Sequence, residues 1–161
     1  MPAFKNMNSL NSFLLTAVSE VLEKDAARAV KKVERRNIEQ TVYDATKPRV
    51  YKRRGHDWGL ADERNMKSEI LQDGVLRITN VTKPNKKYKD SLPVTADLPE
   101  LIEYGDGHNN MNYTWSRSDG TDHEFKDARP FTKNTAEELK SQKQHITALK
   151  HGLKNRKIKI K

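Results

Sequence analysis

The sequence predicts an α+β domain in which a long N-terminal helix and a C-terminal helix pack on a small antiparallel β-sheet, with extended loops between these elements. Three observations lead to this prediction. Apolar residues recur at helical spacing near both ends of the chain, an Asp-Gly pair separates two strand-like runs, and 161 residues with 34% hydrophobic content suffice for one modest core. We therefore expect a single domain over residues 1–153 and a basic tail over residues 154–161.

The first helix is expected from Leu10 to about Thr41. The apolar residues that follow one another at steps of three and four are Leu10, Phe13, Leu14, Ala17, Val18, Val21, Leu22, Ala29, Val30 and Val33. The polar residues that can cap its start are Asn8, Ser9 and Asn11. The step from Lys47 to Pro48 disfavours helix beyond about Thr46, because the residue before a proline avoids the helical region.

A β-hairpin is expected in the middle of the chain, where MKSEILQDGVLRITNVT places Asp73 and Gly74 between two runs that can form strands. This pair suits the positive φ values of a tight type I′ turn. Ile70, Leu76 and Ile78 are expected on the buried face of the hairpin. The basic, polar residues 83–90 then interrupt the pattern and predict a loop.

Two short elements and a last helix are expected after this loop. LPELIEYG predicts one or two helical turns, with proline near the start and Gly105 just past the end. The polar residues 105–127 are compatible with a hairpin that has a long connection. The last helix is expected to run to about His151, with a stripe of leucine and isoleucine and Gly152 as its stop. The residues that can cap its start are Thr132, Asn134 and Thr135, with Thr135 and Glu138 at the spacing of a capping box.

The segment TVYDATKPRVYKRRGHDWGL differs from every other part of the chain, because it combines three aromatic residues, five Lys or Arg and a proline within twenty residues. Arginine and lysine must stay at a surface or find anions, whereas tyrosine and tryptophan can each bury a ring. The segment therefore predicts an exposed loop over residues 43–64 that makes contacts. The candidate interface residues in it are Tyr43, Lys47, Pro48, Arg49, Tyr51, Arg53, Arg54, Trp58 and Leu60.

Three interpretations of this loop remain open. Nucleic acid offers phosphates to the basic groups and bases to the rings. A protein interface offers carboxylates to arginine and pockets to tyrosine. The third interpretation is structural: the aromatic residues fold back on the domain and the charges are solvated. The net charge of +9 favours acidic partners without separating the first two.

No catalytic residue, cofactor or metal is expected, and we predict that the protein is not an enzyme. The chain has no cysteine, and its five histidines show no pair at the i, i+4 spacing of a metal site. His123, Glu124 and Asp127 match no metal-binding loop. A nuclease with His56 as general base is an alternative that needs a metal in addition. No apolar stretch approaches the roughly 20 residues that cross a bilayer, so no membrane partner is expected.

Four pieces of the chain occur together in a familiar order. They are VYDATKPRVYKRRG, GLAD, LPELIEYGDG and ARPFTKNTAEELK. In this order the chain resembles the tail-completion proteins of tailed bacteriophages, which are also described as minor tail components. The matching positions are Tyr43, Pro48, Tyr51, Arg53, Arg54, Gly59, Leu60, Glu103, Tyr104, Gly105, Arg129, Pro130 and Phe131. The polar residues 109–127 depart from the family pattern as an insert.

The resemblance implies a structural virion protein of the tail and neck, assembled in the cytoplasm of a host bacterium. Its copies are expected to form a homo-oligomeric ring, six-fold in symmetry, that joins tail to head and contacts neighbouring neck and tail proteins. Non-specific contact with DNA in the lumen of the ring is compatible with this role. The resemblance adds Arg129, Pro130 and Phe131 to the candidate interface. For Phe131 we favour the alternative that the ring packs inward and fixes the last helix to the core. A small basic nucleic-acid-binding protein is the second functional hypothesis.

Overall fold

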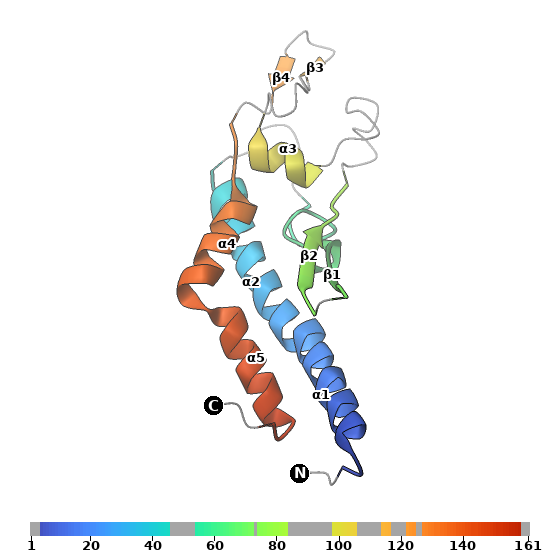
Figure 1. The fold of residues 1–161 in the computed structure, drawn as a ribbon. Coiled ribbons are helices and arrows are strands. Elements are labelled where there is room, and N and C mark those ends of the chain that lie inside the picture. The colour runs from blue at the N-terminus through green and yellow to red at the C-terminus, as the bar shows by residue number, and fades with distance from the viewer. Residues whose placement is uncertain are drawn as a thin grey trace.

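The computed structural model describes residues 4–45, 54–72, 74–83, 98–105, 114–116, 122–124 and 127–158. It shows the predicted α+β fold, with a long N-terminal helix and C-terminal helices beside a small antiparallel hairpin (Figure 1). Of the basic segment, residues 46–53 lie outside the described parts. The predicted loop at residues 84–90 also lies outside them.

The N-terminal helix is longer than predicted and starts earlier. It consists of α1 (Met7–Val21), a π-helical turn (Leu22–Ala26), α2 (Ala27–Ile38) and a second π-helical turn (Glu39–Tyr43). The predicted caps were wrong, because Asn6 is the N-cap: its side chain accepts a hydrogen bond from the amide of Ser9 at 2.9 Å. The Ser9 hydroxyl accepts in return from the amide of Asn6, so each residue satisfies a backbone donor of the other.

The predicted hairpin is confirmed. Strand β1 (Met66–Ile70) pairs antiparallel with β2 (Leu76–Asn80), and Ile70 lies opposite Leu76. The predicted two-residue turn was wrong: Leu71 donates to the carbonyl of Val75 at 2.9 Å, and Gly74 donates to Leu71 at 3.0 Å. Gly74 has a φ of 71°. This is the pattern of a three-residue loop in which glycine takes the left-handed position.

Two more predicted elements are present between the hairpin and the last helices. Helix α3 (Leu98–Tyr104) ends at Gly105, which has a φ of 72° and donates to the carbonyl of Leu101 at 2.9 Å. Strands β3 (Thr114–Ser116) and β4 (Asp122–Glu124) pair antiparallel as a second small sheet. A Cβ atom on Gly105 would lie 2.7 Å from the backbone nitrogen of Ala128, so only glycine permits this approach of the two segments.

The last helix was predicted as one element, and this was wrong. It divides into α4 (Phe131–Gln142) and α5 (Gln144–Asn155) at Lys143, which has a left-handed φ of 53°. Gly152 does not stop the helix. A Cβ atom there would lie 2.5 Å from Asp25 Oδ2 and 2.6 Å from a methyl group of Val21, so the glycine lets α5 pack closely on the long helix.

The first residues of the predicted basic tail are helical. Lys154 and Asn155 belong to α5, although the sequence placed them in a basic tail. Arg156 follows the helix and donates to Glu20 Oε2 at 3.3 Å and to Asp25 Oδ2 at 3.3 Å. These contacts join the end of α5 to the long helix, and α5 runs beside that helix in Figure 1.

The N-terminus of α4 is capped by a residue distant in sequence. The carboxylate of Glu103, at the end of α3, accepts from the amides of Thr132 at 2.7 Å and Lys133 at 3.0 Å. The predicted caps were therefore wrong, and the Thr135 hydroxyl donates instead to the carbonyl of Phe131 at 2.7 Å. A carboxylate at this position satisfies two helix amides and interacts favourably with the helix dipole.

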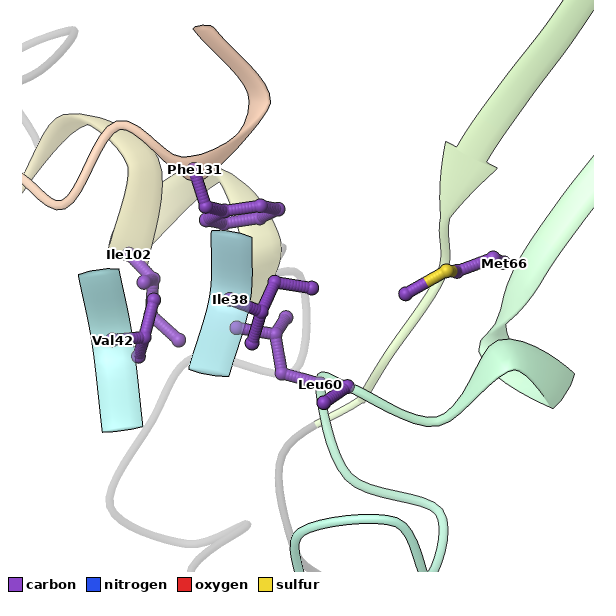
Figure 2. Packing of buried hydrophobic residues seen from close by; sticks show 7 residues of the cluster. Ile38, Val42, Leu60, Met66, Ile102 and Phe131 are labelled. Atoms are coloured by element: carbon purple, nitrogen blue, oxygen red, sulfur yellow. The ribbon is translucent and has the colours of Figure 1, made fainter. Parts of the chain in front are cut away.

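One hydrophobic core joins the elements (Figure 2). Its residues come from the long helix, the loop before β1, β1 itself, α3 and the start of α4: they are Ile38, Val42, Leu60, Ala61, Met66, Ile102 and Phe131. Phe131 and Met66 are each only 1% exposed. Helix α4 is further bound to α2 by Glu138, which accepts from Asn37 at 3.0 Å and pairs with Arg36. The core thus fixes the loop before β1 at a defined place on the long helix.

A buried carboxylate lies between α2 and β2. Burial raises the pKa of Glu34 above its ordinary value of 4.5; a hydrogen bond from Asn80 opposes this rise, nearby Glu103 adds to it, and Lys31 opposes it. The ionised form of Glu34 is therefore disfavoured in the folded protein. Glu34 therefore destabilises the fold least below the unfolded pKa, where the carboxyl is neutral in both states. The free energy of unfolding decreases as the pH rises through the folded pKa.

We expect Glu34→Gln to raise the free energy of unfolding at pH 7, because the amide removes the buried charge and can still accept from Asn80. The gain should shrink toward pH 4, where the wild-type carboxyl is mostly protonated in both states. Denaturant midpoints of both proteins at pH 4 and pH 7 measure this. A gain that is equal at both pH values would contradict the expectation.

Among the described residues, no helix is both long enough and apolar enough to span a bilayer.

Candidate interaction surface around Trp58

The two described ends of the basic segment are each hydrogen-bonded to the domain. At one end, the hydroxyl of Tyr43 accepts a hydrogen bond from the amide of Ala61 at 3.2 Å. At the other, Arg54 Nη2 donates to the carbonyl of Lys83 at 2.6 Å, just after β2. Tyr43 also packs against the core. Both flanks of residues 46–53 are therefore held by the domain. We call these two contacts, Tyr43 with Ala61 and Arg54 with Lys83, the base of the segment.

Buried polar side chains at the open end of the hairpin, on β2 and just outside the two strands, hold the loop after residue 54. Asn65 donates to the carbonyl of Gly59 at 3.0 Å, and Asn80 donates to the carbonyl of Leu60 at 2.9 Å. The Thr82 hydroxyl donates to Asn80 Oδ1 at 2.6 Å. Because buried polar groups without partners are costly, these bonds specify one position for the loop.

Trp58 is exposed, in contrast to Tyr43, the other aromatic residue of this loop that the structure describes. Its side chain is 53% exposed, and its φ of 56° places a large residue in the left-handed region. Such a conformation costs on the order of 1–3 kcal/mol and persists only where surrounding contacts enforce it. Here the enforcing contact is Asp62, whose Oδ2 atom accepts from the amide of Trp58 at 2.7 Å.

Asp62 also fixes Arg64 against the indole. The buried carboxylate accepts from the amide of Arg64 at 2.9 Å and from its guanidinium at 2.6 Å. The guanidinium of Arg64 holds the pKa of Asp62 well below its usual range. The Arg64 guanidinium carbon lies 4.3 Å from the centre of the Trp58 ring, within cation–π distance. We refer to Trp58, Asp62 and Arg64 as the Trp58 platform.

A surface network connects the Trp58 platform to the long helix through His56, whose carbonyl accepts from Arg64 Nη2 at 3.2 Å. His56 Nε2 lies 3.2 Å from Glu39 Oε1, and Arg35 Nε donates to the same oxygen at 3.2 Å. Glu39 opens the second π-helical turn, which ends at Tyr43. The histidine considered above as a general base is thus paired with a carboxylate of the helix. Among the described residues, no cluster of three His, Asp or Glu could hold a metal ion.

The structure divides the predicted interface residues into three groups. Lys47, Pro48, Arg49, Tyr51 and Arg53 lie outside the described residues. Trp58 is exposed, while Arg54 and Tyr43 are partly buried at the base of the segment.

The third group belongs to the core or borders it. Leu60 is 3% exposed and Phe131 1%, so their side chains are packed inside the domain, and the inward packing favoured for Phe131 is observed. Arg129 and Pro130 are half-buried, and the amide of Arg129 donates to Ile102 at 2.9 Å. The motif ARPF therefore joins α3 to α4.

Sequence reasoning missed Asp62 and Arg64. Both lie in the predicted loop, but nothing in ADERN distinguishes a carboxylate that clamps a tryptophan from a solvated one. The available signal was an aspartate four residues after Trp58 with an arginine two residues further on. This spacing is too common to be specific.

The fold and this surface define a small, basic α+β domain with a fixed, exposed tryptophan–arginine pair. The family model named YomN matches residues 6–155, and the chain belongs to the YomN family. This is the name of a phage-derived Bacillus protein, which indicates that the chain is phage-related. Neither the curated proteins nor the solved structures contain a match to the chain.

Proposed function

We propose that the chain is a structural virion protein of a tailed phage, a tail-completion subunit that forms a ring at the joint between tail and head. The observation that carries this proposal is the combination of a phage-related family over residues 6–155 with the ordered motifs of the tail-completion proteins. The family covers all of the motif positions. The proposal assigns the protein a mechanical and interfacial role.

The motif positions support this role because some of them stabilise the fold and others are available for contacts. Leu60, Glu103 and Phe131 build the core and the helix cap, so they maintain the fold. Residues 46–53 contain four Lys or Arg and no Asp or Glu, and the residues on either side of them are hydrogen-bonded to the domain. The Trp58 platform follows in the same loop and is fixed by the hydrogen bonds that Asp62 accepts from Trp58 and Arg64. An assembly subunit needs such an arrangement, in which a rigid domain presents contact residues with little loss of entropy on docking.

In a ring, each subunit presents one Trp58 platform, so the platforms are repeated around the axis. Each copy docks on its neighbour through a heterologous contact, and the rotation closes the ring. Tryptophan and arginine are enriched among the residues that dominate interface energy. We assign the Trp58 platform to the contact with a neighbouring subunit or with the tail end.

Nucleic-acid binding is the second candidate function, favoured by the net charge of +9 and by an indole that can stack on a base. The two functions differ in salt dependence. A DNA binder that uses several basic residues loses affinity steeply with salt, whereas an assembly contact with apolar parts is less sensitive.

Mass photometry of the protein with tail tubes of its own phage, and with double-stranded DNA, separates the two functions at low and at moderate salt. We expect a ring or a tube-end cap that survives moderate salt, together with weak DNA binding. A protein that does not bind tail tubes, and whose affinity for DNA falls steeply with salt, would contradict the proposal and favour nucleic-acid binding.

A further inference from the structure

The outer face of α5 carries a row of exposed lysines. Lys143 directly precedes the helix, and Lys150 and Lys154 follow at steps of seven and four residues, with the exposed Thr147 between them. At 100° per residue, Lys150 and Lys154 each lie about 160° around the helix from Gly152, the residue that packs on the long helix. Helix α5 and the hairpin lie on opposite sides of the long helix in Figure 1. We refer to Lys143, Lys150 and Lys154 as the α5 lysine row.

The α5 lysine row lies in the part of the chain that holds almost all of its net charge. Residues 139–161 contain eight Lys or Arg and no Asp or Glu, so all 22 acidic residues precede them. The net charge of +9 therefore arises almost entirely from this last part of the sequence. Among the described residues after 139, only Arg156 forms ion pairs with carboxylates, and these hold it against the long helix. The three lysines of the row have no such partner in the described parts of the chain.

The spacing of the α5 lysine row fits an anion with closely repeated charges. The row extends roughly 16 Å along the helix axis at 1.5 Å per residue. Lys150 and Lys154 are like charges four residues apart, an arrangement that disfavours a helix, and a bound polyanion removes this repulsion. Double-stranded DNA carries one negative charge per about 1.7 Å of its axis, so a duplex of the same length offers a phosphate to each lysine.

The side chains of this face distinguish nucleic acid from other acidic partners. Lysine is depleted in the core of protein–protein interfaces, which aromatic residues and arginine dominate. A helix that lies on a membrane needs a free apolar face, whereas Leu153 of α5 is buried in the domain. The lysine ammonium is a point charge that suits single phosphate oxygens and lacks the planar fork with which arginine reads bases. The chemistry of the row thus favours the phosphate backbone of DNA.

We propose that the outer face of α5 binds double-stranded DNA through its phosphates, without sequence preference, and that each lysine of the α5 lysine row neutralises one phosphate. This surface uses none of the residues of the Trp58 platform. It therefore goes beyond the proposed joining role and does not rest on it. It also differs from base stacking on the indole of Trp58, because phosphate contacts need no unpaired base.

The salt dependence of DNA binding tests this surface. Fluorescence anisotropy with a labelled DNA duplex of mixed sequence measures the affinity of the full chain between about 50 and 200 mM salt. Each phosphate contact adds about −0.9 to the slope of log affinity against log salt. Lys150→Gln/Lys154→Gln should therefore weaken binding at least about tenfold at low salt and make the slope shallower by about 1.8. Its thermal midpoint should stay at the wild-type value, because both lysines are exposed.

The matched control is Lys67→Gln/Lys133→Gln, which lowers the net charge by the same amount at exposed positions of β1 and α4. Its affinity for DNA and its slope should stay close to wild type, because neither residue belongs to the α5 lysine row. Equal losses in the two double variants would mean that net charge alone attracts DNA. That result, or a wild type that binds no DNA at low salt, would overturn the proposal.

Two further measurements separate this surface from other sources of binding. Polyglutamate of the same total charge should displace the labelled DNA poorly, because its lower charge density releases fewer counterions. Displacement equal to that by unlabelled DNA would indicate an acidic protein as the partner and would overturn the choice of DNA. Trp58→Ala should keep the wild-type affinity for DNA. Loss of binding in Trp58→Ala, with Lys150→Gln/Lys154→Gln unaffected, would assign the binding to the indole instead.

Attachment to tail tubes distinguishes this proposal from the proposed function. Lys150→Gln/Lys154→Gln should attach to tail tubes as the wild type does while it loses DNA. The DNA measurements use the isolated protein without tail tubes, so the two proposals can fail separately.

Discussion

Phe131→Ala is expected to lower the free energy of unfolding by about 3–5 kcal/mol, the range observed when a buried phenylalanine is truncated. Phe131 is 1% exposed and lies in the core among Ile38, Val42 and Ile102 (Figure 2). Its loss leaves a cavity at the point where α3, α4 and the long helix meet. Because small domains have a total stability of only about 5–15 kcal/mol, the variant should be close to unfolding at 37 °C. Chemical denaturation followed by circular dichroism measures the change.

Two controls separate this cavity effect from a general loss of apolar surface. Phe131→Leu keeps much of the volume and should be less destabilising than the alanine variant. Val75→Ala truncates a side chain that is 54% exposed in the hairpin loop and should stay within about 0.5 kcal/mol of wild type. A loss below 1 kcal/mol for Phe131→Ala would mean that the residue does not connect α4 to the core.

Trp58→Ala is expected to weaken docking to a neighbouring subunit or to the tail end by about 2 kcal/mol or more, which corresponds to roughly thirty-fold in affinity. The indole is 53% exposed and fixed by Asp62 and Arg64, so truncation removes a preorganised contact. Alanine keeps the left-handed backbone conformation and its strain, and the thermal midpoint of the isolated protein should therefore change little. Co-sedimentation with tail tubes and a thermal melt give the two readouts.

The matched control for this prediction is Ile146→Ala, which truncates another exposed apolar side chain, 37% exposed on α5. It should leave attachment to tails unchanged. Equal attachment by the wild type and Trp58→Ala would remove the Trp58 platform from the interface. The basic residues 46–53 would then be left as the candidate contact.

The elements predicted correctly from the sequence are those that local chemistry determines. The hairpin follows from two strand-like runs around Asp-Gly, and α3 follows from a short apolar period that ends in glycine. Gly105 was identified as a helix end because a left-handed residue is needed there, and its φ of 72° agrees. For these elements no distant part of the chain has to be known.

The errors concern features that residues far apart in sequence decide. The cap of α4 comes from Glu103, about thirty residues upstream, so the local candidates Thr132, Asn134 and Thr135 were misleading. Gly152 resembles a helix stop in isolation, but Val21 and Asp25 explain why a glycine is needed inside α5. Tertiary packing here determines what the local pattern leaves open.

The candidate site shows the same division. Apolar residues serve both cores and interfaces, so the sequence could not separate Leu60 and Phe131, which are buried, from Trp58, which is exposed. Nor could it predict the left-handed φ of Trp58, because tryptophan rarely adopts this conformation. The contacts of Asp62 explain how the conformation is held.

Head-to-tail joining in vitro tests the tail-completion role most directly. Heads and tails from a phage that lacks this gene are mixed with the purified protein, and joined particles are counted by electron microscopy. We predict that heads and tails stay separate without the protein, join when wild type is added, and join poorly with Trp58→Ala. Efficient joining in the absence of the protein would contradict a tail-completion role.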